Sequence, residues 1–128
     1  MNILTAIPLL GVNEVKFGMN RDEVRKIFGQ AREFKKSKFS KNTTDDFGFC
    51  HVFYDQDNKC EAIEIFPEVE VFIDGKNVFS EDLEILKSMF SDFEEDESGF
   101  FSKKYSIGIY APCKKTESIL LGCDGYYA

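Results

Sequence analysis

Cys50 and His51 are adjacent in the sequence, and their side chains are of the types that form a cysteine nucleophile with a histidine base. A thiol becomes a nucleophile when an imidazole can take its proton, and His51 is the only histidine among 128 residues. Adjacent residues on a strand point to opposite faces, and the residues around this pair are typical of a strand. We therefore interpret His51 as a core or interface residue and not as half of a catalytic pair.

The segment Asp55-x-Asp57-x-Lys59 begins like a calcium-binding EF-hand loop. Such a loop needs glycine at its sixth position and a bidentate acid at its twelfth, where this chain has Cys60 and Phe66. We predict a hairpin turn instead. The cysteines and the single histidine lack the spacing of a zinc site, and the phosphate-binding and hydrolase glycine motifs are absent. The sequence therefore favours a protein without catalytic residues, metal or cofactor. A small enzyme with an unrecognised site is a further hypothesis beside the two given at the end of this subsection.

Composition predicts one folded domain that covers residues 1–128. The chain has 14 phenylalanines, no tryptophan and a formal net charge of −7, which is typical of a globular protein and favours basic partners over nucleic acid or anionic membranes. No stretch approaches the ~18 apolar residues of a membrane span. We expect a cytoplasmic protein, in which the first ten residues form a strand or buried segment and the four cysteines are reduced, mostly buried thiols. These are Cys50, Cys60, Cys113 and Cys123.

Residues 17–29 predict a short amphipathic helix. Asn20 is a good N-cap, Glu23 follows three positions later as in a capping box, and Gly29 can end the helix. The apolar face consists of Val24, Ile27 and Phe28.

Two hairpins align without a gap when one is shifted by 56 positions. Residues 48–66 predict strands at 49–54 and 60–66, and residues 104–122 match them in their apolar pattern. A second helix is predicted within residues 79–90, with Ser80 as its N-cap. The order helix, loop, hairpin thus occurs twice, which suggests pseudo-repeats at about 12–66 and 67–124.

Residues 68–74 predict a further strand between the two copies, with glutamates on one face and aliphatic side chains on the other. Together these elements predict an α+β fold. In this fold a duplicated helix–loop–β-hairpin unit forms one antiparallel sheet, and both helices pack on one face of it.

The segments FGMN, DEV and IFG within residues 17–29, and the hairpin that follows at 48–66, resemble a known family of small modules. These are helix-plus-hairpin repeats similar to β-lactamase inhibitor protein and to outer-membrane assembly lipoproteins of the BamE type, and small proteins encoded beside bacterial toxin genes are similar too. The resemblance implies a protein that binds another protein and catalyses nothing.

Two charged segments occupy equivalent places in the predicted repeat. Residues 31–42 are basic and residues 91–101 are acidic, and each contains phenylalanines. Both could be solvated connections, they could pair with each other within the molecule or head to tail in a dimer, or the acidic one could bind a partner. For that last hypothesis we select the acids for electrostatic steering and Phe100 or Phe101 as an anchor. The selected residues are Asp92, Glu94, Glu95, Asp96, Glu97, Phe100 and Phe101.

Our leading hypothesis is a bacterial immunity protein that neutralises a basic toxin domain. The alternative is a cytoplasmic self-associating or scaffold module without a toxin partner. The sequence leaves open whether the protein is a monomer or a homodimer.

Overall fold

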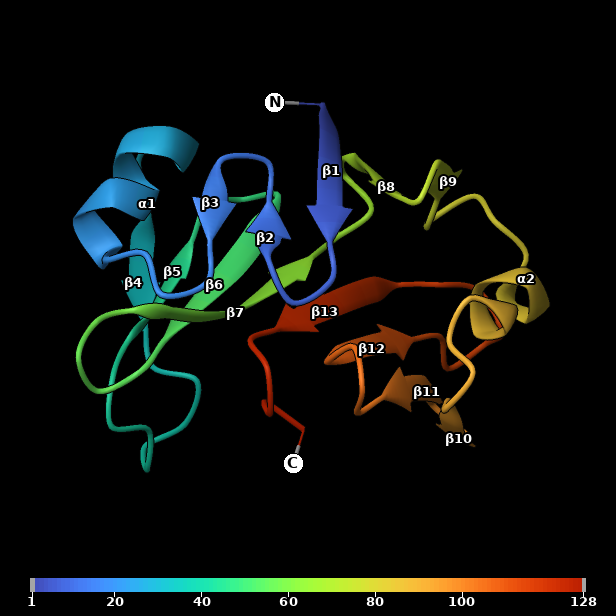
Figure 1. The fold of residues 1–128 in the computed structure, drawn as a ribbon. Helices are drawn as coiled ribbons and strands as arrows, with labels where there is room; N and C mark the ends of the chain where they lie inside the picture. The colour runs from blue at the N-terminus through green and yellow to red at the C-terminus, as the bar shows by residue number, and fades with distance from the viewer. Residues whose placement is uncertain (1, 128) are drawn as a thin grey trace.

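The computed structural model describes residues 2–127, which form two β-sheets and two short helices (Figure 1). Within these residues there are thirteen strands, and the helices are α1 (Arg21–Phe28) and α2 (Leu83–Ser88). The prediction of an α+β fold with one antiparallel sheet and both helices on one face is therefore wrong. The protein is mainly β, and its strands divide between two sheets.

The smaller sheet gathers strands from both halves of the chain. Its order is β3 (Val15–Lys16), β2 (Gly11–Val12), β1 (Ile3–Ile7), β8 (Glu70–Ile73) and β9 (Lys76–Asn77). Strands β1 and β8 are parallel, with Leu4 opposite Val71. The predicted strand at 68–74 exists in part as β8 and buries one face as expected, but it belongs to this second sheet. Sequence patterns missed that sheet because several of its strands have only two residues, too few to show a period.

The larger sheet is antiparallel throughout. Its order is β10 (Glu94–Asp96), β11 (Gly99–Ser102), β12 (Ile107–Tyr110), β13 (Ser118–Gly122), β7 (Cys60–Ile65), β6 (Cys50–Tyr54), β5 (Thr44–Asp46) and β4 (Arg32–Phe34). The two hairpins predicted at 48–66 and 104–122 are β6–β7 and β12–β13. The acidic segment 91–101, expected as a loop, forms most of the hairpin β10–β11 at one edge of the sheet.

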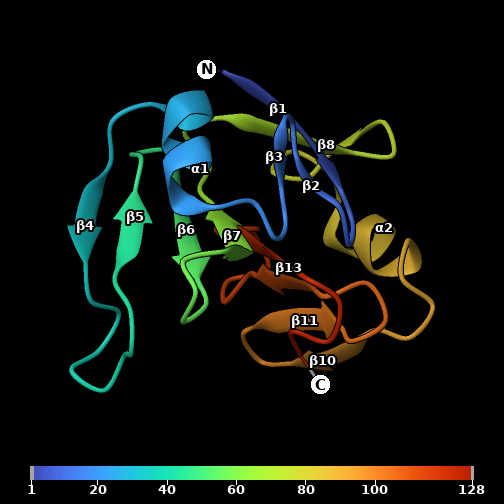
Figure 2. The same ribbon diagram turned by 60° about the vertical axis from the view of Figure 1, so that its left-hand side comes forward.

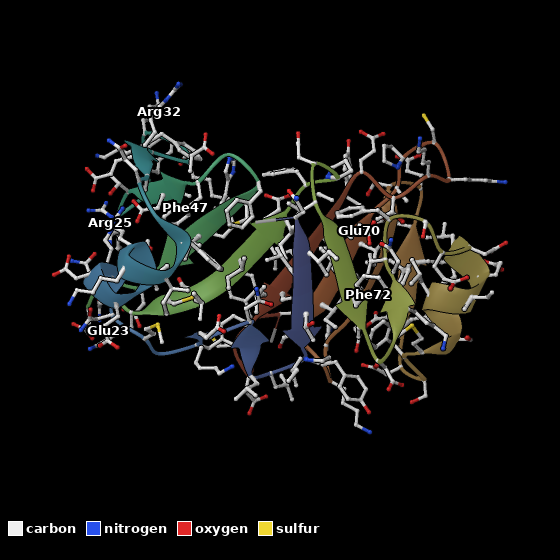
Figure 3. All side chains as sticks on the ribbon, turned by 90° about the horizontal axis from the view of Figure 1, so that it is seen from above. Glu23, Arg25, Arg32, Phe47, Glu70 and Phe72 are labelled. Atoms are coloured by element: carbon white, nitrogen blue, oxygen red, sulfur yellow. The ribbon has the colours of Figure 1, made fainter. Side chains whose placement is uncertain are left out.

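The smaller sheet lies over the larger one, and the core lies between them (Figures 1 and 3). Aliphatic side chains from both sheets meet in a single buried cluster, among them Leu4, Val71, Ile63 and Leu121. The helices lie at opposite ends of the molecule (Figures 1 and 3), and Figure 2 shows α1 above β6. Each helix therefore covers one end of the core.

Helix α1 begins and ends where the sequence predicts. The side chain of Asn20 accepts a hydrogen bond from the backbone N–H of Glu23 at 3.2 Å, and Gly29 follows the last turn with φ of 100°. Helix α2 begins later than predicted: its N-cap is Asp82, which accepts from the N–H of Glu84 at 2.9 Å. Ser80 is not the N-cap, because it lies in a separate turn before the helix, in which its N–H and that of Glu81 both bond to the carbonyl of Asn77.

The same series of elements occurs twice along the chain. A two-strand hairpin, a helix and four antiparallel strands fill residues 11–65, here called repeat one, and residues 70–122, here called repeat two. The first hairpins turn at Asn13 and Asp74, with φ of 51° and 50°. The last hairpins turn at Asn58 and Lys114, with φ of 58° and 65°. Left-handed residues are uncommon outside glycine, so their recurrence at matching places marks equivalent turns.

The two repeats meet through strands β7 and β13 at the centre of the larger sheet. Ile63 pairs with Leu121, Ile65 with Ile119, and Glu64 with Leu120. Adding 56 to a residue number of β7 gives the equivalent residue of β13, so Ile63 corresponds to Ile119 and Ile65 to Leu121. The first two pairs are therefore equivalent to each other, and Glu64 corresponds to Leu120, its own partner. The register is therefore symmetric about the Glu64–Leu120 pair, and an approximate two-fold axis relates the repeats.

Candidate functional site

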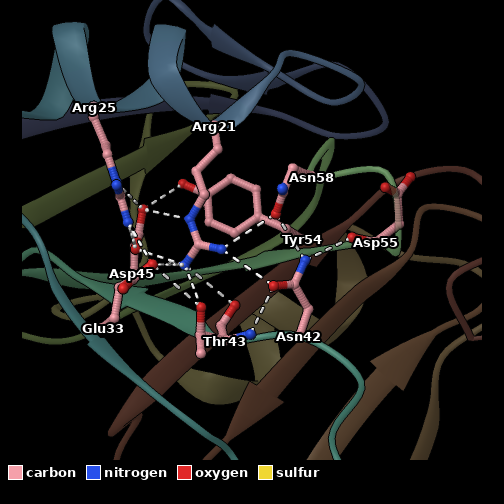
Figure 4. A network of polar contacts seen from close by, with 9 residues as sticks. All are labelled: Arg21, Arg25, Glu33, Asn42, Thr43, Asp45, Tyr54, Asp55 and Asn58. Carbon is pink, nitrogen blue, oxygen red and sulfur yellow. Dashed lines mark hydrogen bonds and ion pairs between the residues drawn. The ribbon is translucent and has the colours of Figure 1, made fainter.

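In each repeat the helix, the turn of the last hairpin and the two outermost strands of the larger sheet meet at one place. This place is closed in repeat one and open in repeat two. In repeat one it is filled by a network of polar side chains around Arg21 and Asp45 (Figure 4). In repeat two it is a groove of about 780 Å³ between α2, the hairpin β10–β11 and the turn that follows β12.

Asp45 is the centre of the closed site and is fully buried. Arg21 donates to its Oδ1 from Nη2 at 2.8 Å, and Arg25 donates to both carboxylate oxygens at 2.7 and 2.8 Å. The hydroxyl of Tyr54 donates to Oδ2 at 2.9 Å, and the Arg21 guanidinium lies 4.4 Å from the Tyr54 ring centroid. A buried carboxylate is tolerated here because several charge-assisted hydrogen bonds replace its water.

The loop between β4 and β5 closes this site from outside. Thr43 Oγ1 accepts from Arg21 Nη2 at 2.8 Å, and Asn42 Oδ1 accepts from Nη1 at 3.2 Å. The amide of Asn42 donates to the carbonyl of Asp55 at 2.9 Å and to Asn58 Oδ1 at 2.8 Å. The end of the loop is thus tied to both the helix and the hairpin turn.

The electrostatics of the closed site argue for a structural role. Burial raises the pKa of the Asp45 carboxyl, but hydrogen bonds from Arg25, Arg21 and Tyr54 outweigh burial and lower that pKa to about 2. Hydrogen bonding to Asp45 raises the pKa of Arg25, and burial raises the pKa of Tyr54. A carboxylate held in this way is a poor general base, because a base works best with a pKa near the ambient pH.

The cysteines do not supply a nucleophile in the buried part of the molecule. All four are free thiols, of which Cys50 and Cys60 are buried. Burial raises the pKa of both, to about 12 for Cys60. His51 lies on the other face of its strand, with its ring between Phe34 and Phe66 at 4.9 and 4.7 Å, as the alternation of the strand predicts.

Acidic side chains dominate the open groove of repeat two. Its carboxylates are Glu81, Asp82, Glu84, Glu95, Asp96 and Glu97, and its cations are Lys87, Lys114 and Lys115. Lys87 is held by Glu84 at 2.9 Å and by Glu95 at 2.5 Å. The lining thus keeps an excess of negative charge, which raises the local concentration of cations and basic chains.

The structure separates the residues that the sequence grouped as one partner-binding segment. Glu95, Asp96 and Glu97 line the groove, whereas Asp92 is held inward by Ser102 Oγ at 2.7 Å. Asp96 also accepts from the N–H and hydroxyl of Ser98, both at 2.8 Å, and so it shapes the hairpin turn.

Glu94 is exposed beside the groove without lining it, because it precedes Glu95 on β10 and faces the other side of the sheet. Phe100 is only 3% exposed and its ring packs into the core, so it does not lie at the surface, where the anchor hypothesis placed it. Phe101 is half-buried and stacks on Tyr127 at 5.6 Å.

The basic segment 31–42 lies at the other end of the larger sheet, where it forms edge strand β4 and part of the loop after it. Phe39 in this loop is 81% exposed, and Lys36 lies 4.3 Å from the ring centroid of Phe53. The basic and acidic segments of one molecule are therefore on opposite edges and do not pair with each other.

No family model, curated protein or solved structure matches the chain. The resemblance to toxin-inhibitor modules thus stays an expectation from the sequence. Within residues 2–127 no helix is long and apolar enough to cross a bilayer, and no acidic, histidine or cysteine side chains there cluster as metal ligands.

Sequence reasoning missed Arg21, Asp45 and Tyr54 as a unit. Arg21 occupies the first position of an amphipathic helix, where a charged residue is normally solvated, and Asp45 follows a polar loop. The three come together only when β5 and β6 pair and α1 packs beside them. The one signal in the sequence was the absence of a matching arginine and aspartate in the second copy.

Removing the Asp45 carboxylate should destabilise the protein strongly. Asp45→Ala removes the buried counter-ion of Arg21, a residue that is 9% exposed, and leaves it only the half-exposed Glu33 at 3.3 Å. We expect a loss of about 3–5 kcal/mol. The double variant Arg21→Leu/Asp45→Ala should be less destabilised than the sum of its parts, by about 1–3 kcal/mol. Glu33→Ala, at a side chain that is 54% exposed, should cost below about 1 kcal/mol. Urea unfolding of these variants measures their unfolding free energies. If the losses of the two single variants simply add up in the double variant, Arg21 and Asp45 are not energetically coupled.

Asp45 should also make stability depend on acid pH. Its folded pKa of about 2 lies below the ordinary value of 3.8, so its contribution is complete above pH about 4 and is lost as pH falls towards about 2. Asp45→Asn should flatten the pH dependence of the unfolding free energy in this window. Some slope should remain from Asp92 and Asp96, whose pKa values are lowered by hydrogen bonds with Ser102 and Ser98. Asp57→Asn, at an exposed turn position, is the control and should keep the parent slope.

Proposed function

We propose that this protein is a non-catalytic protein-binding module that holds a basic partner in the acidic groove of repeat two. We further propose that the partner is a bacterial toxin, which the protein neutralises in the cytoplasm as an immunity protein. The observation that carries the proposal is the groove itself, a concave surface of about 780 Å³ with six carboxylates in its lining.

The edge strand β10 supports a protein partner in particular. It is the outermost strand of the larger sheet at this end, so one side of its backbone is available to pair with another chain. Its sequence is Glu94-Glu95-Asp96. Like charges placed opposite each other destabilise a strand pair, so this edge repels its own copy and favours a basic strand.

The test begins with affinity capture of partners from bacterial lysate at low and high salt, followed by mass spectrometry. The proposal expects a basic protein that is released by salt, is toxic when expressed alone and is harmless when co-expressed with this chain. Capture of acidic or non-toxic proteins alone would count against the immunity role.

Charge reversal in the groove should slow association with the captured partner. Glu95→Lys/Glu97→Lys should lower the association rate constant roughly tenfold at low salt and weaken its salt dependence. Glu14→Lys/Glu68→Lys changes the net charge equally at exposed positions outside the groove and should have a much smaller effect. Surface plasmon resonance measures both, and equal effects would show that only net charge matters.

Self-association is the second candidate function, and one observation favours it: the lysine-rich loop that follows edge strand β4 and the acidic edge strand β10 lie at opposite ends of one sheet. Head-to-tail pairing of such edges would be heterologous and would build chains or rings. Analytical ultracentrifugation at low salt should then show a mass that grows with protein concentration, and Lys35→Glu/Lys36→Glu should abolish the growth. A monomer under all conditions would exclude this candidate.

A further inference from the structure

The two-fold relation of the repeats identifies equivalent residues on both faces of the larger sheet. On the core face Phe100 stands where Asp45 does, because each lies opposite the middle residue of its edge strand. Each helix begins one residue after its N-cap, which places Leu83 where Arg21 stands. The core face of repeat two is therefore apolar where that of repeat one is charged.

The outer face of the larger sheet, which points away from the smaller sheet, also differs between the repeats. In repeat one it carries the rings of His51 and Phe66, whose centroids are 4.7 Å apart. Gly108 is the counterpart of His51, because each lies opposite the residue at the centre of symmetry in its own hairpin. The offset of 56 makes Gly122 the counterpart of Phe66. Repeat two thus has glycine at both places where repeat one has an aromatic ring.

Two tyrosines that follow β13 fill the places left by these glycines. The chain leaves β13 on the side away from the smaller sheet (Figure 1) and turns at Gly125, which has φ of 81°. A Cβ atom on Gly108 would collide with the hydroxyl of Tyr127, and one on Gly122 would lie 2.6 Å from Cγ of Tyr126. The two tyrosine rings are 5.5 Å apart and edge to face, as is the aromatic pair of repeat one. A separate segment therefore supplies the rings that the strands of repeat one carry themselves.

Ring packing holds this segment, residues 123–127, here called the strap. Tyr127 stacks on Phe101 at 5.6 Å with 22° between the ring planes, and burial raises the pKa of Tyr127 to about 12. The N–H of Cys123 bonds to the carbonyl of Glu61, and the N–H of Tyr126 bonds to the carbonyl of Cys123 within the strap itself. The two rings can therefore leave the sheet by a change at the turn, without breaking a strand pair.

We propose that the two glycine notches, Gly108 and Gly122, form a binding site for two adjacent aromatic side chains of a partner chain, and that the strap covers this site until the partner displaces it. Two independent observations carry the inference: the notches already hold an aromatic pair from outside the sheet, and the equivalent places in repeat one also hold an aromatic pair. Neither glycine lines the acidic groove, so the inference goes beyond the function proposed above.

The surroundings of the notches favour a basic residue beside the aromatic pair. A hollow of about 250 Å³ lies next to Tyr127, and Glu64 and Asp96 are in its lining. No lysine or arginine of residues 2–127 lines it, so its charge is complementary to a cation. Aromatic anchors supply much of the affinity of protein interfaces. The occupant is therefore a segment of two aromatic residues followed by lysine or arginine.

The test uses the fluorescein-labelled peptide Gly-Ser-Tyr-Tyr-Lys-Gly and a reference peptide with serines in place of the tyrosines. The parent should bind the tyrosine peptide weakly, because the attached strap competes at a high effective concentration. Tyr126→Gly/Tyr127→Gly removes both rings of the strap and should bind the tyrosine peptide about tenfold more tightly than the parent does. It should not bind the serine peptide. Fluorescence anisotropy measures both affinities.

Two control variants separate the notches from other effects of the substitutions. Tyr126→Phe/Tyr127→Phe keeps both rings in the strap and should bind the peptide as weakly as the parent does. Gly108→Ala/Gly122→Ala, added to the variant without strap rings, fills both notches and should abolish binding. Neither glycine has a positive φ, so alanine is compatible with the backbone there. Thermal unfolding shows whether each variant is folded.

A measurement on the parent keeps the inference testable if the variants do not fold. Excess tyrosine peptide should shift the amide NMR signals of Gly108 and Gly122, and excess serine peptide should not. Unchanged signals would refute the site.

The remaining outcomes are equally decisive. The aromatic site is refuted if the variant without strap rings binds no better than the parent, binds both peptides equally, or still binds after the notches are filled. If the parent dimerises and Tyr126→Gly/Tyr127→Gly makes it a monomer, the occupant is the strap of a second copy and the proposal is wrong. Binding that follows the predicted order supports the site whether or not a basic toxin is captured.

Discussion

The antiparallel pairing of β7 with β13 is the interaction on which the rest of the fold depends. It joins the two repeats into one sheet of eight strands, and its register is symmetric about Glu64 and Leu120. Because the pair is central, both repeats present the same aliphatic face to the smaller sheet, and one core serves the whole chain. The same symmetry places the helices at opposite ends of the molecule (Figure 1). There each helix forms one wall of an equivalent site.

At these two equivalent sites the same arrangement of helix and strands encloses different side chains, charged in repeat one and apolar in repeat two. In repeat one a buried carboxylate, Asp45, is compensated by two arginines and a tyrosine hydroxyl. In repeat two the matching positions hold Phe100 and Leu83, which need no compensation. A buried ion pair can be exchanged for apolar residues of similar size without loss of stability. The core of repeat two therefore needs no covering loop, and its charged groove is open to solvent.

Local features were the part of the fold that the sequence predicted well. The N-cap at Asn20, the stop at Gly29 and the two hairpins are decided by neighbouring residues, and the structure has them. The N-cap predicted at Ser80 was wrong because residues 77–81 form a turn of their own and the helix begins only after Asp82. Phe100 was expected at the surface because it belongs to the acidic segment 91–101. Its partner across the sheet, Ile109, instead shows that it lies on the core face.

The sequence by itself determined the helix caps, the alternation of β8, the hairpins and their offset of 56 positions, because each of these depends on residues close together in the chain. Only the tertiary structure decided that the strands divide between two sheets, that Arg21 meets Asp45, and that the acids of 92–97 separate into groove, turn and outer face. Each of these outcomes rests on contacts between distant segments, such as the parallel pairing of β1 with β8. Their register is set by packing of the whole core, which no local pattern encodes.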